Sequence, residues 1–295
     1  DEHKYSFPLQ DRIQIELEKI KEKAAARNAS YVAPKNSMML WRDPEADIRV
    51  VASGCLSPSN NTKTGDMLQI ASLVDSVGPT EAIKQKIDSI VCFTCALART
   101  VCYVNPVFLL AIWKATNNQE SIGGFPRVLK HVRFGSYGEI AGVLPLNIMK
   151  EWIAYLQENK LKWTGYTHRW MDLGVSPWSQ WIMASIDAIT AANNCMTVIQ
   201  LKEWANSMGW ATYRVLDKEE VEDLVEGDIL PDEILCPYFT HKVQCADCGL
   251  CNGKRLPIWS RLLQIFKPNK RKNIVALLGG PKNKRKAYTK TAVTV

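Results

Sequence analysis

The stretch from Lys130 to Tyr166, KHVRFGSYGEIAGVLPLNIMKEWIAYLQENKLKWTGY, decides the fold. It begins with strand-like residues, Lys130 to Phe134, and ends with a second strand-like run, Lys162 to Tyr166. Between them, residues 146–157 repeat apolar side chains at the spacing of an amphipathic helix. A strand, a helix and a strand at this spacing imply two parallel strands joined by a right-handed crossover.

The same alternation continues on both sides of this stretch. We expect further strands at 49–52, 181–185 and 211–215, helices at 10–28, 66–77, 79–90, 106–116 and 198–209, and a short connection at 187–194. The sequence therefore predicts an α/β fold with a mainly parallel sheet, of which a partial or complete β/α barrel is one form, and a cysteine-rich C-terminal segment. Such sheets carry their chemistry at the carboxyl ends of the strands.

Composition limits the class of protein. With 46% hydrophobic and 23% charged residues, the chain is not wholly disordered. No run approaches the roughly 18 apolar residues of a membrane span, and no apolar signal core follows the first residues. We expect no membrane association and a cytoplasmic location. Three parts are predicted: an N-terminal helical extension (1–48), an α/β metal-binding core (49–253) and a basic C-terminal segment (254–295).

Positive charge is concentrated in that last segment. Residues 254–295 contain twelve Lys and Arg and no Asp or Glu, so residues 1–253 carry 7 − 12 = −5 of the total charge of +7. A basic tail of this kind attracts nucleic acid or other anionic surfaces. The alternative is a solvated end that only aids solubility.

The nine cysteines carry the strongest functional signal. An odd number without a secretory signal makes a full disulfide framework an unlikely use for them. The first cysteine group is Cys92, Cys95 and Cys102, in which the CxxC pair lets two sulfurs converge on one metal. The second is a C-x2-C-x2-C run, which is the beginning of the bacterial ferredoxin pattern. Its members are Cys245, Cys248 and Cys251, preceded by Cys236.

The spacing leaves the metal open. Three closely spaced cysteines favour one or two [4Fe–4S] clusters, whereas structural zinc usually takes its ligands as two pairs. Zinc is the alternative, with His241 replacing a thiolate, and reduced structural or redox cysteines are the third interpretation. We expect Cys236 to be the fourth ligand of the second group. The first group then has three cysteines, with either Cys55 or an open iron position as the fourth.

Several motifs follow one another in an order that resembles a known family. This uncharacterised family occurs in phages, plasmids and bacteria and is distantly similar to the phage gene-product-eighty-eight family. The motifs are NTKTGDMLQ (61–69), CFTCALARTVCYVN (92–105), VRFGSYGE (132–139), TGYTHRW (164–170), ASID (184–187), CP (236–237) and CADCGLCNG (245–253). Glu139 stands where that family's pattern has Asp, and residues 276–279 lack the histidine of its Ala-His-Gly-like turn.

Related phage families are similar to radical S-adenosylmethionine enzymes, and this analogy implies a cofactor site. Those enzymes combine a partial α/β barrel, a three-cysteine cluster and a glycine-rich strand end that holds the cofactor. Here the analogy assigns S-adenosylmethionine to Gly135, Ser136, Gly138 and Glu139, although the spacing of the first cysteine group differs from the usual one. It rests on the fold alone.

Three residues are candidates for catalysis because each follows a predicted strand: Glu139, His168 and Asp187. The alternatives are a structural histidine bonded to backbone and an aspartate that caps a helix. Together these observations predict an iron–sulfur or other metal-binding protein of mobile-element origin, in the form of a radical-SAM-like enzyme acting on nucleic acid or a nucleotide. The alternatives are a non-catalytic, metal-stapled nucleic-acid-binding protein and a zinc-dependent nuclease.

Overall fold

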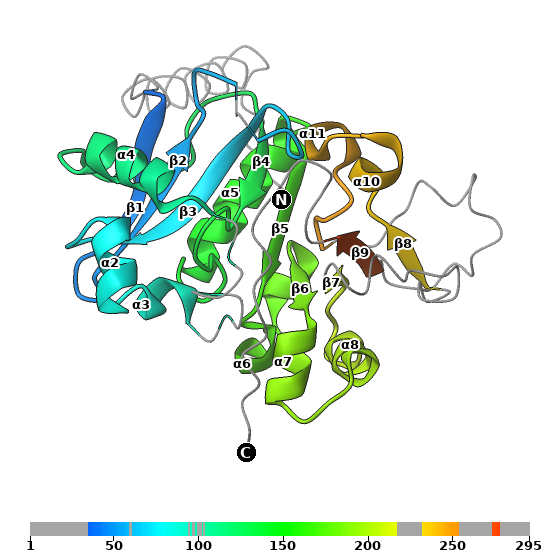
Figure 1. The fold of residues 1–295 in the computed structure, drawn as a ribbon. Coiled ribbons are helices and arrows are strands. Elements are labelled where there is room, and N and C mark those ends of the chain that lie inside the picture. Colours follow the sequence, from blue (N-terminus) through cyan, green and yellow to red (C-terminus); the bar gives the residue numbers. More distant parts are fainter. Residues whose placement is uncertain are drawn as a thin grey trace, which may run out of the picture.

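The computed structural model describes residues 35–58, 61–93, 95, 98, 102, 104–216, 232–253 and 273–277. Its strands form one nine-stranded sheet in the order β1-β2-β3-β4-β5-β6-β7-β9-β8 (Figure 1). The strands are β1 (Ser37–Asp43), β2 (Ile48–Ser53), β3 (Met67–Val74), β4 (His131–Phe134), β5 (Trp163–Thr167), β6 (Met183–Ile186), β7 (Thr212–Leu216), β8 (Glu233–Leu235) and β9 (Asn273–Leu277).

The sheet is mainly parallel, as predicted. β1, β2 and β3 pair antiparallel, and every pair from β3 to β8 is parallel. From β3 to β7 the spatial order equals the chain order, so each crossover moves in the same direction. Because crossovers are right-handed, consecutive connections of this kind place their helices on one face of the sheet. The α/β fold with a mainly parallel sheet is confirmed.

The helices lie between these strands. They are α2 (Pro79–Gln85), α3 (Ser89–Cys92), α4 (Pro106–Thr116), α5 (Leu146–Glu158), α6 (Trp170–Leu173), the 3₁₀ turn η1 (Pro177–Gln180), α7 (Ala188–Asn193), α8 (Val198–Ser207), α10 (Pro237–His241) and α11 (Cys245–Cys248). Within the part of the chain that the structure describes, no helix has both the length and the apolar character needed to cross a membrane.

Two apolar clusters cover the two faces of the sheet. On the helix face, Trp152 of α5 stacks on Phe134 of β4, with ring centroids 6.5 Å apart. Successive strand residues point to opposite faces, and Ala184 packs with the helices while its neighbour Met183 packs with Cys236 and Cys251. The C-terminal cysteine segment therefore covers the face of the sheet opposite the helices.

This segment also enters the sheet itself. β5 and β6 pair only from Tyr166 and Met183 onward. Before that point the amide of Gly165 donates to the carbonyl of Cys251 (2.9 Å). Gly253 lies against the backbone of Trp181, where a Cβ atom would come within 2.6 Å of the Trp181 nitrogen. The cysteine segment thus occupies a seam between the first residues of β5 and β6.

Some sequence predictions are corrected. The helix expected at 66–77 is wrong, since this segment is the strand β3, buried on both faces. The connection expected at 187–194 contains α7. The sheet extends beyond the predicted boundary at residue 48, because β1 pairs with β2. The helix predicted at 10–28 lies outside the described residues.

Candidate metal centres

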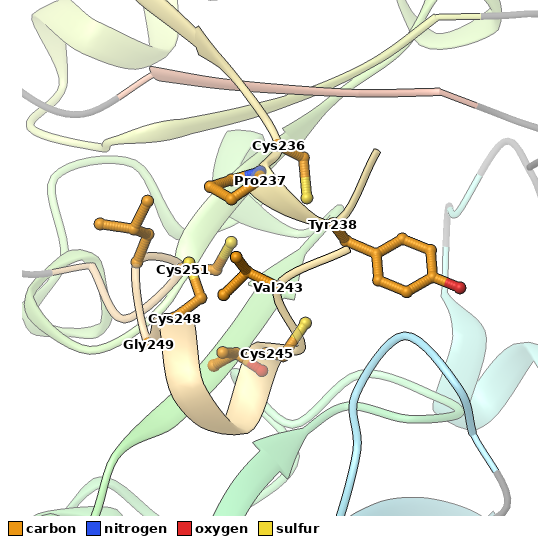
Figure 2. A pocket seen from close by; sticks show the side chains of 10 residues that line it. Cys236, Pro237, Tyr238, Val243, Cys245, Cys248, Gly249 and Cys251 are labelled. Atoms are coloured by element: carbon orange, nitrogen blue, oxygen red, sulfur yellow. The ribbon is translucent and has the colours of Figure 1, made fainter. Parts of the chain in front are cut away.

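Four cysteines surround one hollow on the face of the sheet opposite the helices. Cys236, Cys245, Cys248 and Cys251, here called the four-cysteine group, line it together (Figure 2). The rest of the lining is Thr164, Pro237, Tyr238, Val243, Gly249 and Leu250. The empty volume is about 280 Å³, counting the space at its mouth.

Local backbone geometry brings the thiols to this hollow. Cys236 precedes α10, whose first residue is Pro237, a residue favoured at that position. α11 is a single turn between Cys245 and Cys248, and its cap Gly249 is left-handed (φ +64°). This cap reverses the chain, so that Cys251 returns to the sheet.

The loop before β3 supports the same segment from the other side. The amide of Cys245 donates to the Lys63 carbonyl (2.9 Å), and the next amide, of Ala246, donates to the Thr64 carbonyl (3.0 Å). The side chain of Gln244 donates to the carbonyl of Thr62 (3.1 Å). A loop that the sequence marks only as a turn is therefore a structural support of the four-cysteine group.

Burial disfavours the charged form of these thiols. It raises the pKa of Cys251, and the neighbouring thiols of Cys245 and Cys236 raise it further. Burial also raises the pKa of Cys245, which the positive charges of Lys63 and Arg133 partly oppose. A bound metal cation would supply positive charge at the sulfurs themselves and favour the thiolates.

Two cations lie beside the hollow, the partly exposed Lys63 and the buried Arg133, and sequence reasoning connected neither of them with the cysteines. The ammonium of Lys63 donates to the Tyr213 hydroxyl (2.7 Å) and lies 5.1 Å from the Phe239 ring centroid. No carboxylate pairs with Lys63 among the described residues. Arg133 is 3% exposed and lies over the ring of Tyr166, which stacks on Tyr213 at 4.3 Å. His241, the alternative zinc ligand, ends α10 and is not one of the residues that line the hollow.

The first cysteine group lies elsewhere. Cys92 ends α3, and its pKa is raised to about 12, first by burial and then by the negative charges of Asp88, Cys95 and Cys102. The thiol of Cys102 in turn interacts electrostatically with Cys95 and with His168. The three thiols are thus near neighbours, and they lie beside a histidine.

Glu139 and His168 form a hydrogen-bonded pair at this place. Glu139, 4% exposed, accepts from the Thr167 hydroxyl (2.5 Å), the His168 amide (3.0 Å) and His168 Nδ1 (3.1 Å). The other ring nitrogen, Nε2, is buried and has no hydrogen-bond partner in the described structure. Burial acts to lower the pKa of His168, but Cys95 and Glu139 outweigh burial and raise it well above its ordinary value.

The remaining candidates have structural partners. Both carboxylate oxygens of Asp187 bond to Thr190, to its amide (2.8 Å) and to its hydroxyl (2.7 Å), so that Asp187 caps α7. This is the alternative role expected for it. The amide of Ser136 donates to the Ile70 carbonyl (2.8 Å), and the Ser72 amide donates to the Tyr137 carbonyl (2.9 Å).

Glycine geometry in the turn at 135–139 follows from the same packing. A Cβ on Gly138 would lie 2.5 Å from the Ser72 carbonyl oxygen, and one on Gly135 would lie 3.4 Å from the Gly138 carbonyl oxygen. The glycines are therefore explained by the close approach of the turn to β3 and to itself. S-adenosylmethionine at this turn stays a prediction.

The two cysteine groups lie toward opposite ends of β5. The Lys162 ammonium, just before β5, donates to the Asp247 carbonyl in α11, whereas His168 follows the strand directly. Six residues of extended chain span roughly 20 Å. Figure 1 shows α11 near the start of β5 and α6 at its other end. The groups therefore form two separate candidate centres.

The other two cysteines stand apart. Burial raises the pKa of Cys55 to about 11, and its charged neighbour is Lys130 rather than a member of either group. Cys195 is exposed. As the side chains stand, no set of three or more His, Cys, Asp and Glu among the described residues could hold a metal ion. The donor chemistry nevertheless suits one, because each group unites soft thiolate ligands and the first has a buried histidine nitrogen without a partner.

Comparisons with known proteins identify no relative. No protein-family model matches the chain, and neither a curated protein nor a solved structure matches it. The resemblance to the phage, plasmid and bacterial family stays a prediction from the motifs.

Proposed function

We propose that this chain is an iron–sulfur protein in which Cys236, Cys245, Cys248 and Cys251 hold a [4Fe–4S] cluster. The observation that carries the proposal is that all four thiols line one hollow beside Lys63 and Arg133. Four thiolates outweigh the positive charge of a cubane core, so the bound centre is negative overall. The positive charges of Lys63 and Arg133 act on Cys245 and would offset such a charge.

The donor pattern favours a cluster over zinc. Three of the four cysteines come from one C-x2-C-x2-C run, as in ferredoxins, whereas zinc sites usually take two separate pairs. Zinc in the same four thiolates is the alternative. Because cysteine fills all four positions, the centre would serve structure or electron transfer.

Catalysis belongs to the other end of β5 in this proposal. Glu139 and His168 lie beside the first cysteine group there, near the carboxyl ends of parallel strands, where such sheets place their active sites. A radical-SAM-like reaction on nucleic acid or a nucleotide, the mobile-element origin and the cytoplasmic location rest on the motifs, the resemblance and the basic tail.

Metal analysis of anaerobically purified protein tests the four-cysteine centre. We expect iron and acid-labile sulfide in the wild type, and a loss of both in Cys251→Ser. Melting temperature should fall by many degrees, because a structural metal contributes folding free energy directly. The matched control is Cys195→Ser, which changes an exposed cysteine outside both groups and should keep the metal.

Two results would contradict the proposal at different levels. Zinc without sulfide in the wild type would show that the four cysteines bind zinc and not an iron–sulfur cluster. Unchanged metal content and melting temperature in Cys251→Ser would show that the four-cysteine group is not a metal centre at all.

A further inference from the structure

The imidazole of His168 is held in one orientation by a buried carboxylate. Glu139 Oε1 accepts from both the amide and Nδ1 of His168, at 3.0 and 3.1 Å. Its other oxygen, Oε2, accepts from the Thr167 hydroxyl at 2.5 Å. Three hydrogen bonds fix the carboxylate, and the carboxylate fixes the ring with the proton on Nδ1. In the neutral ring, the form that binds a metal, the lone pair is then on Nε2.

That lone pair is directed into the protein and has no partner. Nε2 is buried, and no described donor reaches it within hydrogen-bond geometry. A buried nitrogen without a partner calls for an explanation such as an ion. Histidines that bind metals show this arrangement, in which one nitrogen faces a carboxylate and the other binds the metal.

Beyond Glu139, the groups that interact with this ring are thiols. Cys95 interacts with His168 directly, and Cys102 interacts with both of them. Cys92 completes the set from the end of α3. Three thiolates and one imidazole make up one of the common structural zinc donor sets. Cys102 is exposed, so its side chain has room to turn toward the other three.

We propose that His168 is the fourth ligand of a second metal centre, formed with Cys92, Cys95 and Cys102 and oriented by Glu139. This centre is separate from the four-cysteine group and does not depend on it. It fills the fourth position with a protein ligand, in place of the open iron or Cys55 expected from the sequence. A centre closed in this way is an alternative to the radical-SAM-like reaction proposed above, which needs an open iron. The ion it fits best is zinc or another divalent cation that accepts three sulfurs and one nitrogen.

Metal coordination in the full-length chain tests this site. In Cys251→Ser, which removes a ligand of the other centre, cobalt or zinc should bind with three sulfurs and one nitrogen by X-ray absorption. If that variant does not fold, the wild-type background serves: His168→Cys should turn the nitrogen ligand into a fourth sulfur. His168→Ala should lose one centre and retain the iron of the other. His241→Ala, at the end of α10, is the matched control and should lose nothing.

Glu139 is a positioning residue in this proposal, and its own effect is smaller. Replacing the carboxylate behind a metal-bound histidine typically weakens metal affinity 10- to 100-fold. We expect Glu139→Gln to weaken metal affinity by a factor in that range, measured by competition with a chelator. His168→Ala should weaken it by a larger factor.

Three outcomes would overturn the assignment. One is unchanged metal content in His168→Ala, and another is a first coordination shell of sulfur alone in the wild type. The third is a metal-free site in which Cys95 alone reacts rapidly with iodoacetamide and slows in His168→Ala. That last result would identify a thiol nucleophile with a histidine base. None of them concerns the four-cysteine centre, which is tested separately by the iron and sulfide content of the wild type and by Cys251→Ser.

Discussion

Buried charge at single residues governs how the four-cysteine group responds to a metal. The pKa of Lys63 is raised well above its ordinary value, because the negative forms of Tyr213, Tyr166 and Cys236 outweigh the opposing effect of burial. At neutral pH the tyrosines are protonated, so thiolates are the negative partner that the ammonium needs. A metal that turns the thiols into thiolates therefore also stabilises Lys63.

This coupling predicts opposite effects of one substitution in two states. Lys63→Met should stabilise the metal-free protein by about 1–3 kcal/mol, because it removes a buried ammonium that lacks a carboxylate partner. The same change should destabilise the metal-loaded protein by a similar amount. Urea unfolding with and without chelator measures both. Lys84→Met, with a side chain 79% exposed, is the control for loss of charge. Effects of equal sign in both states would contradict the coupling.

At the residue scale, sequence spacing and tertiary burial contributed different parts of the site. The short intervals within each cysteine group predict that its sulfurs converge, because few intervening residues limit how far two side chains can separate. As the side chains stand, no such set among the described residues could hold a metal ion. No local pattern places Lys63 beside the cysteines. Its partner Tyr213 lies 150 positions away, so its environment exists only after the sheet has formed.

Elements show where periodicity succeeds and where it misleads. α5 matches the predicted amphipathic helix within one residue, since it has one polar face, and α4 has the bounds expected for an apolar helix. β3 was expected to be a helix because Met67, Ile70 and Val74 recur at helical intervals. It is apolar at most positions because both of its faces are covered, and a short apolar run cannot be assigned by period alone.

The seam between β5 and β6 gives a prediction at this scale. Gly253 has φ +69°, and a Cβ there would meet the Trp181 and Ile182 nitrogens at 2.6 and 2.7 Å. Gly174 has a similar φ of +56° with open space around it. Both Ala variants have the backbone strain of about 1–2 kcal/mol. Gly253→Ala should cost a further 1–3 kcal/mol or so from overpacking, and should also lose metal.

Thermal and chemical unfolding of Gly253→Ala and Gly174→Ala tests this prediction. Equal destabilisation at the two positions would mean that the segment can move away from Trp181 without consequence for the sheet. Metal retention in Gly253→Ala would mean that the seam and the four-cysteine group are independent.

The molecule as a whole combines a mainly acidic body with a basic end. The fold class of the body was predicted correctly from the sequence, because alternating strands and helices can be arranged in only a few ways. The position of β9 between β7 and β8 was not predicted, because no local signal in the sequence reports the order of distant strands. The basic segment at 254–295 lies outside the described residues except for β9.

We propose that this segment binds nucleic acid electrostatically. Affinity should then fall steeply with salt, and deleting residues 281–295 should reduce the slope of log K against log salt. Each lost phosphate contact reduces it by roughly 0.9 for duplex DNA. The deletion removes five cations, Lys282, Lys284, Arg285, Lys286 and Lys290. Filter binding across a salt series measures the slope, and an unchanged melting temperature shows that the body is intact. Salt-independent binding, or none, would contradict the proposal.

The hydrogen bond from Gly165 to the Cys251 carbonyl can form only late in synthesis on the ribosome. The acceptor follows the donor by 251 − 165 = 86 residues. At roughly 5–20 residues per second, the part of β5 before Tyr166 lacks this partner for about 4–17 s after Gly165 is made, whereas β6 can pair with β5 from Tyr166 onward much sooner. During this interval the edge is a template for wrong pairing. Chaperone capture, and delivery of a metal to the last cysteines as they emerge, would then determine when the sheet closes.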